Sequence, residues 1–316
     1  MRIAIVGAGA LGGFYGGLLA RAGHEVLFIA RGEMLRAFRE SGLRVERDGG
    51  PGNDSFSIHP LRAVSDPAGE APVDLVLFTT KTYGLEDAAP LAGPLLHEGT
   101  FVLPLLNGVD ITERLQGLLG PARVLGGLSY LPANVPRPGV VRQAGFQNPL
   151  RFGVPTTSSF AGLEELRETL REAGINAELS HDIVADQWAK FVLVTSTSGS
   201  STLTGLPLGD VAADPDRKAL FGSIAAETAA VAEALGVGLA PDVVPRALGY
   251  LDEVPAHTKP SMLQDLERGR PLELESLQGT VVRLGGKTGV PTPVNRCVYA
   301  ALKHLARGRL QAGAGG

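Results

Sequence analysis

The chain has 316 residues, enough for two domains, and its composition of 44% hydrophobic and 20% charged residues is that of a globular protein. The formal net charge is −4 and no basic block is present, so neither nucleic acid nor an anionic membrane is an expected partner. The single cysteine cannot form an internal disulfide, no apolar run approaches the roughly 20 residues of a membrane span, and the N-terminus lacks a signal-peptide pattern. We therefore expect a cytoplasmic protein.

The first predicted element is a buried strand over Arg2–Val6 that runs into a glycine-rich turn, Gly7 to Gly12, and then into a helix rich in alanine and leucine. In such a G-x-G-x-x-G turn the first glycine permits the tight turn, and the second, Gly9, lets the backbone approach a pyrophosphate. The third glycine lets the helix pack closely on the strand. Because strand, turn and helix follow in this order, we predict that a dinucleotide binds at the helix N-terminus.

The next predicted strand, Glu25–Ile29, leads into Arg31. An acidic residue about 20 residues after the glycine turn binds the ribose 2′-hydroxyl of NAD, whereas an arginine nearby accommodates the 2′-phosphate of NADP. Arg31 therefore favours NADPH as the cofactor. In the alternative interpretation, Arg31 is a surface residue and Glu33 is a slightly late ribose-binding acid.

Short apolar runs alternate with helical patterns through the first half of the chain, which predicts a parallel sheet with crossover helices. The polar, glycine-rich segment Gly42–Ile58 predicts a hairpin or a loop excursion. An amphipathic helix is expected over Phe160–Glu172, with Gly174 as its C-cap. The other strands that we expect are Val73–Thr79, Thr100–Leu105, Arg123–Leu128, Gly139–Ala144 and Leu150–Val154.

The second half of the chain is predicted to be mainly α-helical. Asp182 can cap a helix that runs through Lys190 and onward, and the tail Gln311–Gly316 is expected to fray. The predicted fold class is α/β, with an N-terminal Rossmann-like doubly wound sheet (residues 1–180) followed by an all-α C-terminal domain (residues 181–316). An active site is then expected in the cleft between them. Further helices are expected over Arg217–Leu235, Pro241–Leu251, Leu272–Gly285 and Pro293–Leu305.

Lysine is scarce in this chain, with six lysines against 23 arginines. A desolvated lysine can lose its proton and act as an acid, which an arginine cannot do. Lys190 lies in a predicted helix that is otherwise apolar around it, where an unpaired charge would be costly. On spacing alone, a surface lysine that extends to water and pairs with Asp186 is the simpler explanation.

Four further polar residues have both a functional and an ordinary explanation. Lys81 and Asn107 each follow a predicted strand, where side chains face the cofactor in this architecture, but a solvated lysine and an Asn-Gly turn are the ordinary alternatives. Ser261 is placed to cap a helix, and Glu273 favours the dipole of a helix that it would begin. The six histidines are scattered and Cys297 has no second thiol nearby, so no metal site is predicted.

Taken together, these segments resemble the ketopantoate reductase (2-dehydropantoate 2-reductase) family, and the similarity spans nearly the whole chain in the same order. The run that begins at Ser261, together with Glu273, is its most specific part. The segments that carry the resemblance are Gly7-Ala-Gly-Ala-Leu-Gly12, Arg31, Thr80-Lys81, Leu106-Asn107-Gly108, Trp188-Ala-Lys190, Ser261-Met-Leu-Gln-Asp265, Glu273 and Gly289-Val-Pro-Thr-Pro-Val-Asn295.

The resemblance implies NADPH-dependent reduction of a small 2-oxo acid by a Rossmann domain joined to a helical domain. It implies that Lys190 stabilises and protonates the developing alkoxide, and that Glu273 contacts the nicotinamide end of the cofactor. Ser261 would bind the substrate carboxylate, with Thr258 close by and Ser198 as a further substrate contact. The other cofactor-binding residues that it implies are Gly7, Ala8, Gly9, Ala10, Leu11, Gly12, Arg31, Lys81, Asn107 and, on a loop that covers the cofactor, Ala133.

Four positions depart from the asparagines that are common in the family. Val194 and Ser198 stand one and two turns after Lys190, and Leu208 and Thr258 stand at two further asparagine positions. Each lost hydrogen bond is worth about 0.5–1.5 kcal/mol. Either other groups hold the substrate hydroxyl, or the preferred substrate is less polar than ketopantoate.

The leading hypothesis is therefore a ketopantoate reductase of pantothenate biosynthesis, with Lys190 as general acid and the oligomeric state, a homodimer included, left open. The second hypothesis is a related NADPH-dependent reductase of another aliphatic 2-oxo acid, motivated by Val194 and Leu208. The third is a non-catalytic NADP-binding regulatory protein, and the presence of both Lys190 and Glu273 argues against it.

Overall fold

The computed structural model describes residues 1–47, 54–120, 123–145, 149–155 and 160–308. The chain divides into two compact units. The first comprises Met1–Leu106 and Asp110–Ile183, and the second comprises Asn107–Val109 and Val184–Gly316. The tail over Gln311–Gly316, which we expected to fray, lies outside the described residues.

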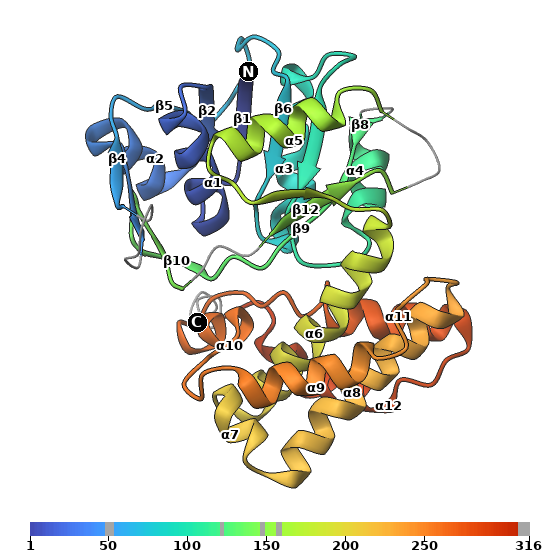
Figure 1. Cartoon of the computed structure of the whole chain (residues 1–316). Helices are drawn as coiled ribbons and strands as arrows, with labels where there is room; N and C mark the ends of the chain where they lie inside the picture. Colours follow the sequence, from blue (N-terminus) through green and yellow to red (C-terminus); the bar gives the residue numbers. More distant parts are fainter. Residues whose placement is uncertain (48–53, 121–122, 146–148, 156–159, 309–316) are drawn as a thin grey trace, which may run out of the picture. The chain divides into compact units, whose positions relative to one another are not determined.

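A six-stranded parallel sheet with the order β5-β2-β1-β6-β7-β8 forms the centre of the first unit (Figure 1). The predicted strands over Arg2–Val6 and Glu25–Ile29 are confirmed as β1 and β2, and the next two are confirmed with slightly shorter bounds. The short edge strand β5 was not predicted from the sequence. The bounds are β1 Arg2–Val6, β2 Glu25–Ile29, β5 Arg62–Val64, β6 Leu75–Phe78, β7 Phe101–Pro104 and β8 Arg123–Val124.

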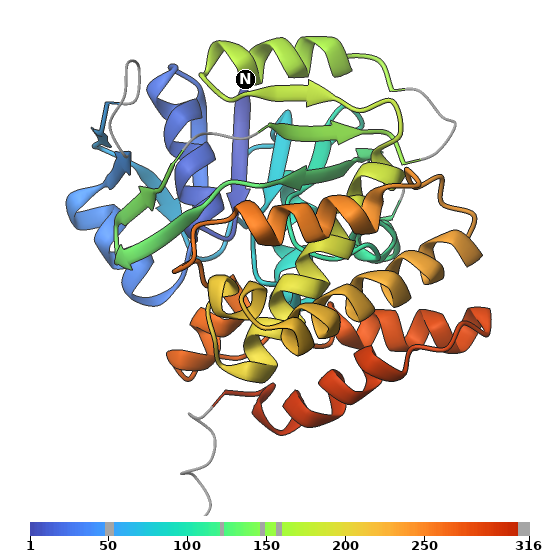
Figure 2. The same ribbon diagram turned by 60° about the horizontal axis from the view of Figure 1, so that its bottom comes forward.

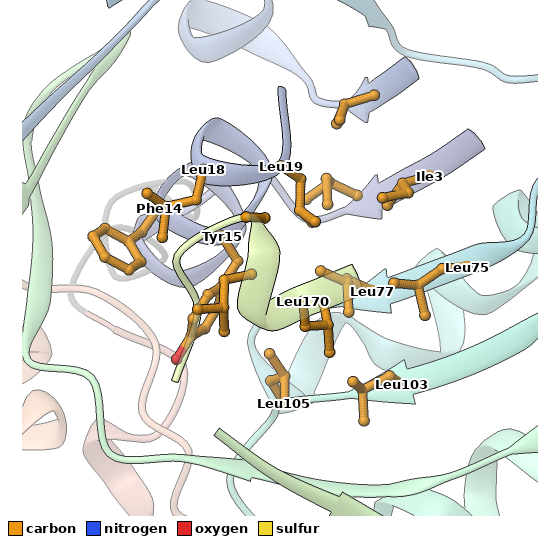
Figure 3. Packing of buried hydrophobic residues seen from close by; sticks show 14 of the residues in the cluster. Ile3, Phe14, Tyr15, Leu18, Leu19, Leu75, Leu77, Leu103, Leu105 and Leu170 are labelled. Atoms are coloured by element: carbon orange, nitrogen blue, oxygen red, sulfur yellow. The ribbon is translucent and has the colours of Figure 1, made fainter. Parts of the chain in front are cut away.

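Successive side chains of the central strands belong to two separate hydrophobic cores, as the period of two in a strand requires. Ile3 and Ile5 pack under α1 (Ala10–Arg21) and α5 (Leu163–Glu172), whereas Ala4 and Val6 pack under α3 (Leu85–Ala92) and α4 (Ile111–Leu119). Figure 3 shows the first core, where leucines of β6 and β7 lie among Tyr15, Leu18 and Leu170. Both faces of the sheet are therefore covered by helices, the doubly wound arrangement that the alternating pattern predicts.

The order of the strands reverses between β1 and β6, because α1 leads from β1 to β2 on one side whereas β6 leads to β7 on the other. Gly7 follows β1 with a φ of 99°, and a Cβ there would lie 2.6 Å from the backbone nitrogen of Thr80, which follows β6. The glycine turn and the loop after β6 are thus in direct contact. Such a switch point at the carboxyl ends of the strands is where open α/β sheets bind ligands.

Two smaller sheets complete the first unit. The segment Gly42–Ile58 contains an antiparallel pair of strands, β3 and β4, which agrees with the hairpin interpretation. The strand expected over Arg123–Leu128 is wrong as one element, because β8 stays in the central sheet and β9 joins β12 in another sheet. The bounds are β3 Leu43–Arg47, β4 Phe56–Ile58, β9 Gly126–Ser129, β10 Ala133–Arg137, β11 Val140–Gln143, β12 Leu150–Gly153 and β13 Ala177–Leu179; α2, at the end of β2, spans Gly32–Ser41.

The helix α5 ends at Glu172 as expected, but its C-cap residue is Ala173, and the predicted cap Gly174 is the next residue. Gly174 has a φ of 82°, and its N–H donates to the carbonyl of Arg171 at 2.8 Å. The N–H of Ile175 donates to the carbonyl of Leu170 at 3.0 Å. A positive φ at this place is adopted most readily by glycine, which explains the sharp exit into β13.

Every regular element in the described part of the second unit is a helix, and Figure 2 shows these helices from a second direction. The predicted helix over Leu272–Gly285 is wrong at its start, since the residues before Gln278 form turns. None of the helices in the described residues is long and apolar enough to cross a bilayer. The bounds are α6 Ile183–Thr204, α7 Leu208–Ala212, α8 Pro215–Ala234, α9 Val243–Glu253, α10 Ser261–Glu267, α11 Gln278–Thr288, α12 Pro293–Leu302 and a final 3₁₀ turn, Lys303–Leu305.

The long helix α6 is buried along most of its length, although its second half consists largely of serine and threonine. Their hydroxyls donate back to carbonyls one turn earlier, for example Ser196 to Val192 at 2.7 Å and Ser200 to Ser196 at 2.7 Å. A Cβ on Gly199 would lie 2.6 Å from the side-chain nitrogen of Gln278. Small, internally bonded side chains therefore allow the neighbouring helices to approach α6 closely.

The packing predicts different effects for two glycine substitutions in the same turn. A Cβ on Gly12 would overlap the carbonyl oxygen of Gly7 and the hydroxyl of Thr79, whereas a Cβ on Gly9 would meet nothing within 4 Å. We expect Gly12→Ala to destabilise the first unit by about 1–3 kcal/mol, and Gly9→Ala to leave its stability unchanged. Urea unfolding of both variants beside the wild type measures this difference, and equal midpoints for all three proteins would contradict it.

Candidate active site

Lys190 is buried in the second unit, with only 8% of its surface exposed. It lies in the first half of α6, between Trp188 and Phe191, whose rings pack edge to face in the hydrophobic core of the unit. The surface-lysine interpretation of the sequence pattern is therefore wrong. A buried ammonium is costly unless a partner compensates its charge.

Glu273 supplies that compensating charge. It is 5% exposed and lies in the turns before α11, held between Leu272 and Leu274, which are both core residues. The expectation that Glu273 begins a helix is wrong, since α11 begins at Gln278. The helix dipole therefore does not explain this acid, and the buried ammonium of Lys190 does.

Burial lowers the pKa of Lys190 from 10.5 to about 8, and the carboxylate of Glu273 acts in the opposite direction by raising it. Desolvation disfavours the charged form of a lysine, and a nearby negative charge favours it. The result is a lysine that is still protonated at neutral pH but can release its proton readily. Such a group is suited to general acid catalysis.

Asn107 joins this pair from a distant part of the sequence. It follows β7, and the segment Asn107–Val109 belongs to the second unit, where Val109 packs against the hydrophobic core. The side-chain nitrogen of Asn107 donates a long hydrogen bond of 3.5 Å to Oε2 of Glu273. The two residues are separated by 166 positions in the chain, and only the fold brings them together.

The three proposed substrate residues differ in exposure. Ser261 is exposed and is the first residue of α10, and Thr258 is half-buried. The N-cap position of α10 is occupied by Pro260, so the capping explanation for Ser261 is wrong. Ser198 is 2% exposed and lies on α6 two turns after Lys190.

The two apolar departures have different surroundings. Leu208 is 1% exposed in a hydrophobic cluster with Val211, Phe221 and other residues. It is a packing residue, so its identity says little about the polarity of the substrate. Val194 is only half-buried and lies one turn after Lys190 on α6.

The glycine turn of the first unit offers the backbone features that suit an anion. The helix α1 has Gly9 as its N-cap, no capping side chain and no acidic residue in its first turn. The position of a Cβ on Gly9 is open space, although Gly7 and Gly12 are tightly packed. Unpaired N–H groups and the helix dipole at such an end favour a phosphate.

A residue that the sequence analysis missed supports the glycine turn. The hydroxyl of Thr79, directly after β6, donates to the carbonyl oxygen of Gly7 at 2.6 Å. A short hydroxyl residue at the carboxyl end of the neighbouring strand was the available signal. Behind the turn, the hydroxyl of Tyr15 is hydrogen-bonded to Ser129 at 2.7 Å, and burial raises the pKa of this tyrosine.

The cations proposed for NADPH lie at the same edge of the central sheet as the turn. Arg31 is exposed and directly precedes α2, at the carboxyl end of β2, while Glu33 is exposed in the first turn of that helix. Lys81 is half-buried and precedes a 3₁₀ turn after β6.

Ala133 is the first residue of strand β10 and not a loop residue as expected. Within the described residues, no group of three or more His, Cys, Asp or Glu side chains could hold a metal ion.

A parallel sheet with a glycine turn at its switch point, followed by a helical unit with a buried lysine, is typical of two-domain oxidoreductases that use nicotinamide cofactors. The chain belongs to the ketopantoate reductase PanE/ApbA family, whose N-terminal model matches residues 3–156 and whose C-terminal model matches residues 182–306. Members of this family are oxidoreductases that act on small keto acids with NAD(P)H.

Similar proteins include more than one activity. A 2-dehydropantoate 2-reductase of Mesorhizobium japonicum is 33% identical, over 97% of this chain and 98% of its own length. The crystal structure of a PanE/ApbA family ketopantoate reductase from Ralstonia eutropha has a TM-score of 0.87 at 34% identity, covering 97% of this chain and 98% of that one. A D-mandelate dehydrogenase, solved with NADH and anilino(oxo)acetate, has a TM-score of 0.89 at 27% identity and similar coverage, 97% and 98%.

The electrostatic role of Glu273 can be measured without any substrate. We expect Glu273→Gln to lower the pKa of Lys190 below the wild-type value of about 8, because the carboxylate that raises it is lost. NMR titration of protein labelled at the lysine ε-carbon measures this pKa, and six lysines give few signals. Glu275→Gln is the matched control, since Glu275 is exposed and binds Tyr299 at 2.6 Å. An unchanged Lys190 titration in Glu273→Gln would refute the pairing.

Proposed function

We propose that the chain is an NADPH-dependent 2-oxo acid reductase whose substrate is ketopantoate. The observation that carries this proposal is the buried Lys190, whose pKa is lowered to about 8 beside the carboxylate of Glu273. In this proposal the first unit binds the cofactor and the second unit binds the substrate. The similar 2-dehydropantoate 2-reductase of Mesorhizobium japonicum supports the choice of substrate.

The proposed chemistry at Lys190 follows from its protonation state. When bound, the reduced nicotinamide supplies hydride to the C2 carbonyl of the substrate. The ammonium of Lys190 stabilises the negative charge that develops on the carbonyl oxygen and donates its proton to that oxygen. Burial strengthens this interaction because few water molecules screen it. Glu273 keeps Lys190 protonated, and Asn107 orients the carboxylate through its hydrogen bond.

The residues of the first unit fit a dinucleotide with a 2′-phosphate. The open space at Gly9 and the N-terminal end of α1 would receive the pyrophosphate, with the backbone N–H groups of the first turn of α1 as donors. Arg31, exposed at the end of β2, would bind the 2′-phosphate, with Lys81 as a second cation at that end. Ser261, exposed at the start of α10, and Thr258 would bind the substrate carboxylate, and Ser198 would contact the substrate beside Lys190.

A second candidate substrate class is a bulkier or less polar 2-oxo acid. Val194 places an apolar side chain one turn after Lys190, and the D-mandelate dehydrogenase is similar over nearly the whole chain. A site that lacks a hydrogen-bonding partner discriminates poorly in favour of a substrate hydroxyl. We therefore include aryl and branched aliphatic 2-oxo acids in the test of the proposed function.

The central assay measures NADPH oxidation with ketopantoate and with a panel of other 2-oxo acids. We expect turnover with ketopantoate, and a kcat/KM that falls as the pH rises through about 8, because Lys190 then loses its proton. Lys190→Ala should lower kcat by at least about 100-fold. Lys218→Ala is the matched control, because Lys218 pairs with Asp252 at 2.6 Å on the exposed surface. Absence of turnover with every acid, or full activity of Lys190→Ala, would overturn the proposal.

The cofactor preference can be tested at Arg31 independently of the substrate. A charge-assisted hydrogen bond to the 2′-phosphate is worth about 1.5–3 kcal/mol, so Arg31→Ala should weaken NADPH binding by roughly 10- to 100-fold. NADH binding should change little. In Glu33→Gln, both affinities should stay near the wild-type values. Fluorescence titration with the two cofactors measures this, and selective loss of NADH binding in Glu33→Gln would favour the alternative, with Glu33 as the ribose-binding acid.

A further inference from the structure

Gln278 is a buried polar residue that the proposed mechanism does not use. It is the first residue of α11 and is fully buried. Its side-chain nitrogen donates to the backbone carbonyl of Thr195 on α6 at 2.8 Å. Its side-chain oxygen has no hydrogen-bond partner among the described residues.

This half-satisfied amide is a poor contributor to stability. A buried acceptor without a partner costs more free energy than one neutral hydrogen bond contributes. The carbonyl of Thr195 also lies within α6, where it accepts the ordinary helical hydrogen bond from four residues later. An apolar side chain of the same size would remove the orphaned oxygen and leave that helical bond intact. The amide therefore calls for an explanation other than stability.

The position of Gln278 relative to Lys190 and Glu273 offers that explanation. Gln278 follows Glu273 by five residues, and Thr195 follows Lys190 by five residues. The segment that contains Glu273 and Gln278 therefore interacts with α6 at two places, once through charge and once through the amide. A side chain placed on α6 at Gly199 would collide with the nitrogen of Gln278, so the contact is close.

Backbone hydrogen bonds make this segment a compact unit. The N–H of Leu277 donates to the carbonyl of Glu273 at 3.1 Å, and the N–H of Gly279 donates to that of Leu274 at 2.9 Å. Leu274 and Leu277 also point into the hydrophobic core of the second unit. A displacement at Gln278 is therefore transmitted to Glu273 through a short, internally bonded stretch of chain.

We propose that Gln278 is a positioning residue, which fixes the turn that carries Glu273 against α6 so that the carboxylate faces Lys190. The inference deepens the proposed function and rests on it only for its effect on turnover. Apolar packing holds the leucines of the turn without specifying its register along α6, and the directional bond from Gln278 to Thr195 supplies that register.

The first test replaces the amide by a side chain of nearly the same size. In Gln278→Met, the ε-carbon-labelled Lys190 should titrate at a pKa at least about 0.5 units below the wild type, since Glu273 is less well placed. Gly199→Ala should lower the same pKa without any substitution at position 278. The new methyl group on α6 would displace the side-chain amide of Gln278 from its contact with the helix. The two variants reach the same contact through different residues, so one that fails to fold leaves the other as the test.

Thr228→Val is the matched control. Thr228 is fully buried on α8, and its hydroxyl lies 3.2 Å from the hydroxyl of Thr195, the residue that Gln278 also contacts. The control removes a buried hydrogen bond to α6 without touching the turn of Glu273. We expect its Lys190 titration to match the wild type, even if its melting temperature falls. A shift in this control as large as in Gln278→Met would reduce the role of Gln278 to general packing.

A double-mutant cycle tests whether Gln278 acts through Glu273. If it does, Gln278→Met lowers kcat by roughly 10-fold or more, whereas adding it to Glu273→Gln causes little further loss. Multiplicative losses in the double variant, or a wild-type Lys190 pKa in both Gln278→Met and Gly199→Ala, would overturn the inference. The NMR titration needs no substrate. A wild type without turnover but with the expected titrations would therefore refute the proposed function and leave the positioning role standing.

Discussion

The second unit is organised around the cost of burying the ammonium of Lys190. Desolvation in the hydrophobic core lowers the pKa of this lysine, and the carboxylate of Glu273 opposes that shift. Each of the two buried charges is stabilised by the other, because a lone buried carboxylate or ammonium is strongly unfavourable. The balance leaves the pKa of Lys190 at about 8. Near neutral pH the ammonium is therefore mostly protonated and can still donate its proton readily.

This balance depends on how the neighbouring segments pack against α6. Hydroxyl side chains such as Ser196 and Ser200 satisfy themselves within the helix, and Gly199 has no side chain at all. This side of α6 therefore carries only small side chains whose hydroxyls are hydrogen-bonded within the helix. The side chain of Gln278 can reach the backbone of α6 there. A side chain at Gly199 would collide with the side-chain nitrogen of Gln278. The absence of a side chain at this position in the second half of α6 thus allows Gln278 to contact the backbone of the helix.

Much of the first unit could be predicted from the sequence, because its signals are local. The buried strand before Gly7 and the glycine after α5 each fix their own backbone, so the bounds of β1 and the end of α5 match the prediction, although α5 begins at Leu163 and not at Phe160. The division of Arg123–Leu128 between two sheets could not be predicted, since it depends on strands that pair far along the chain. The start of a helix near Glu273 could not be predicted correctly either. The sequence over Leu272–Gly285 has a helical pattern, and only the core that its leucines join determines the turns before Gln278.

The residues that bear on the substrate show the same limit most clearly. In the sequence, Val194 and Leu208 have equal weight as apolar replacements of family asparagines. The fold separates them, because Leu208 packs in a closed cluster whereas Val194 is half-buried one turn from Lys190. The case for a less polar substrate therefore depends on the surroundings of one side chain. To select strongly for a substrate with a hydroxyl group, the site would need a hydrogen-bonding partner near Val194. An apolar side chain neither binds a substrate hydroxyl nor rejects it effectively. Ser198, buried on the same helix one turn farther along, carries a hydroxyl that could take this role without the asparagines.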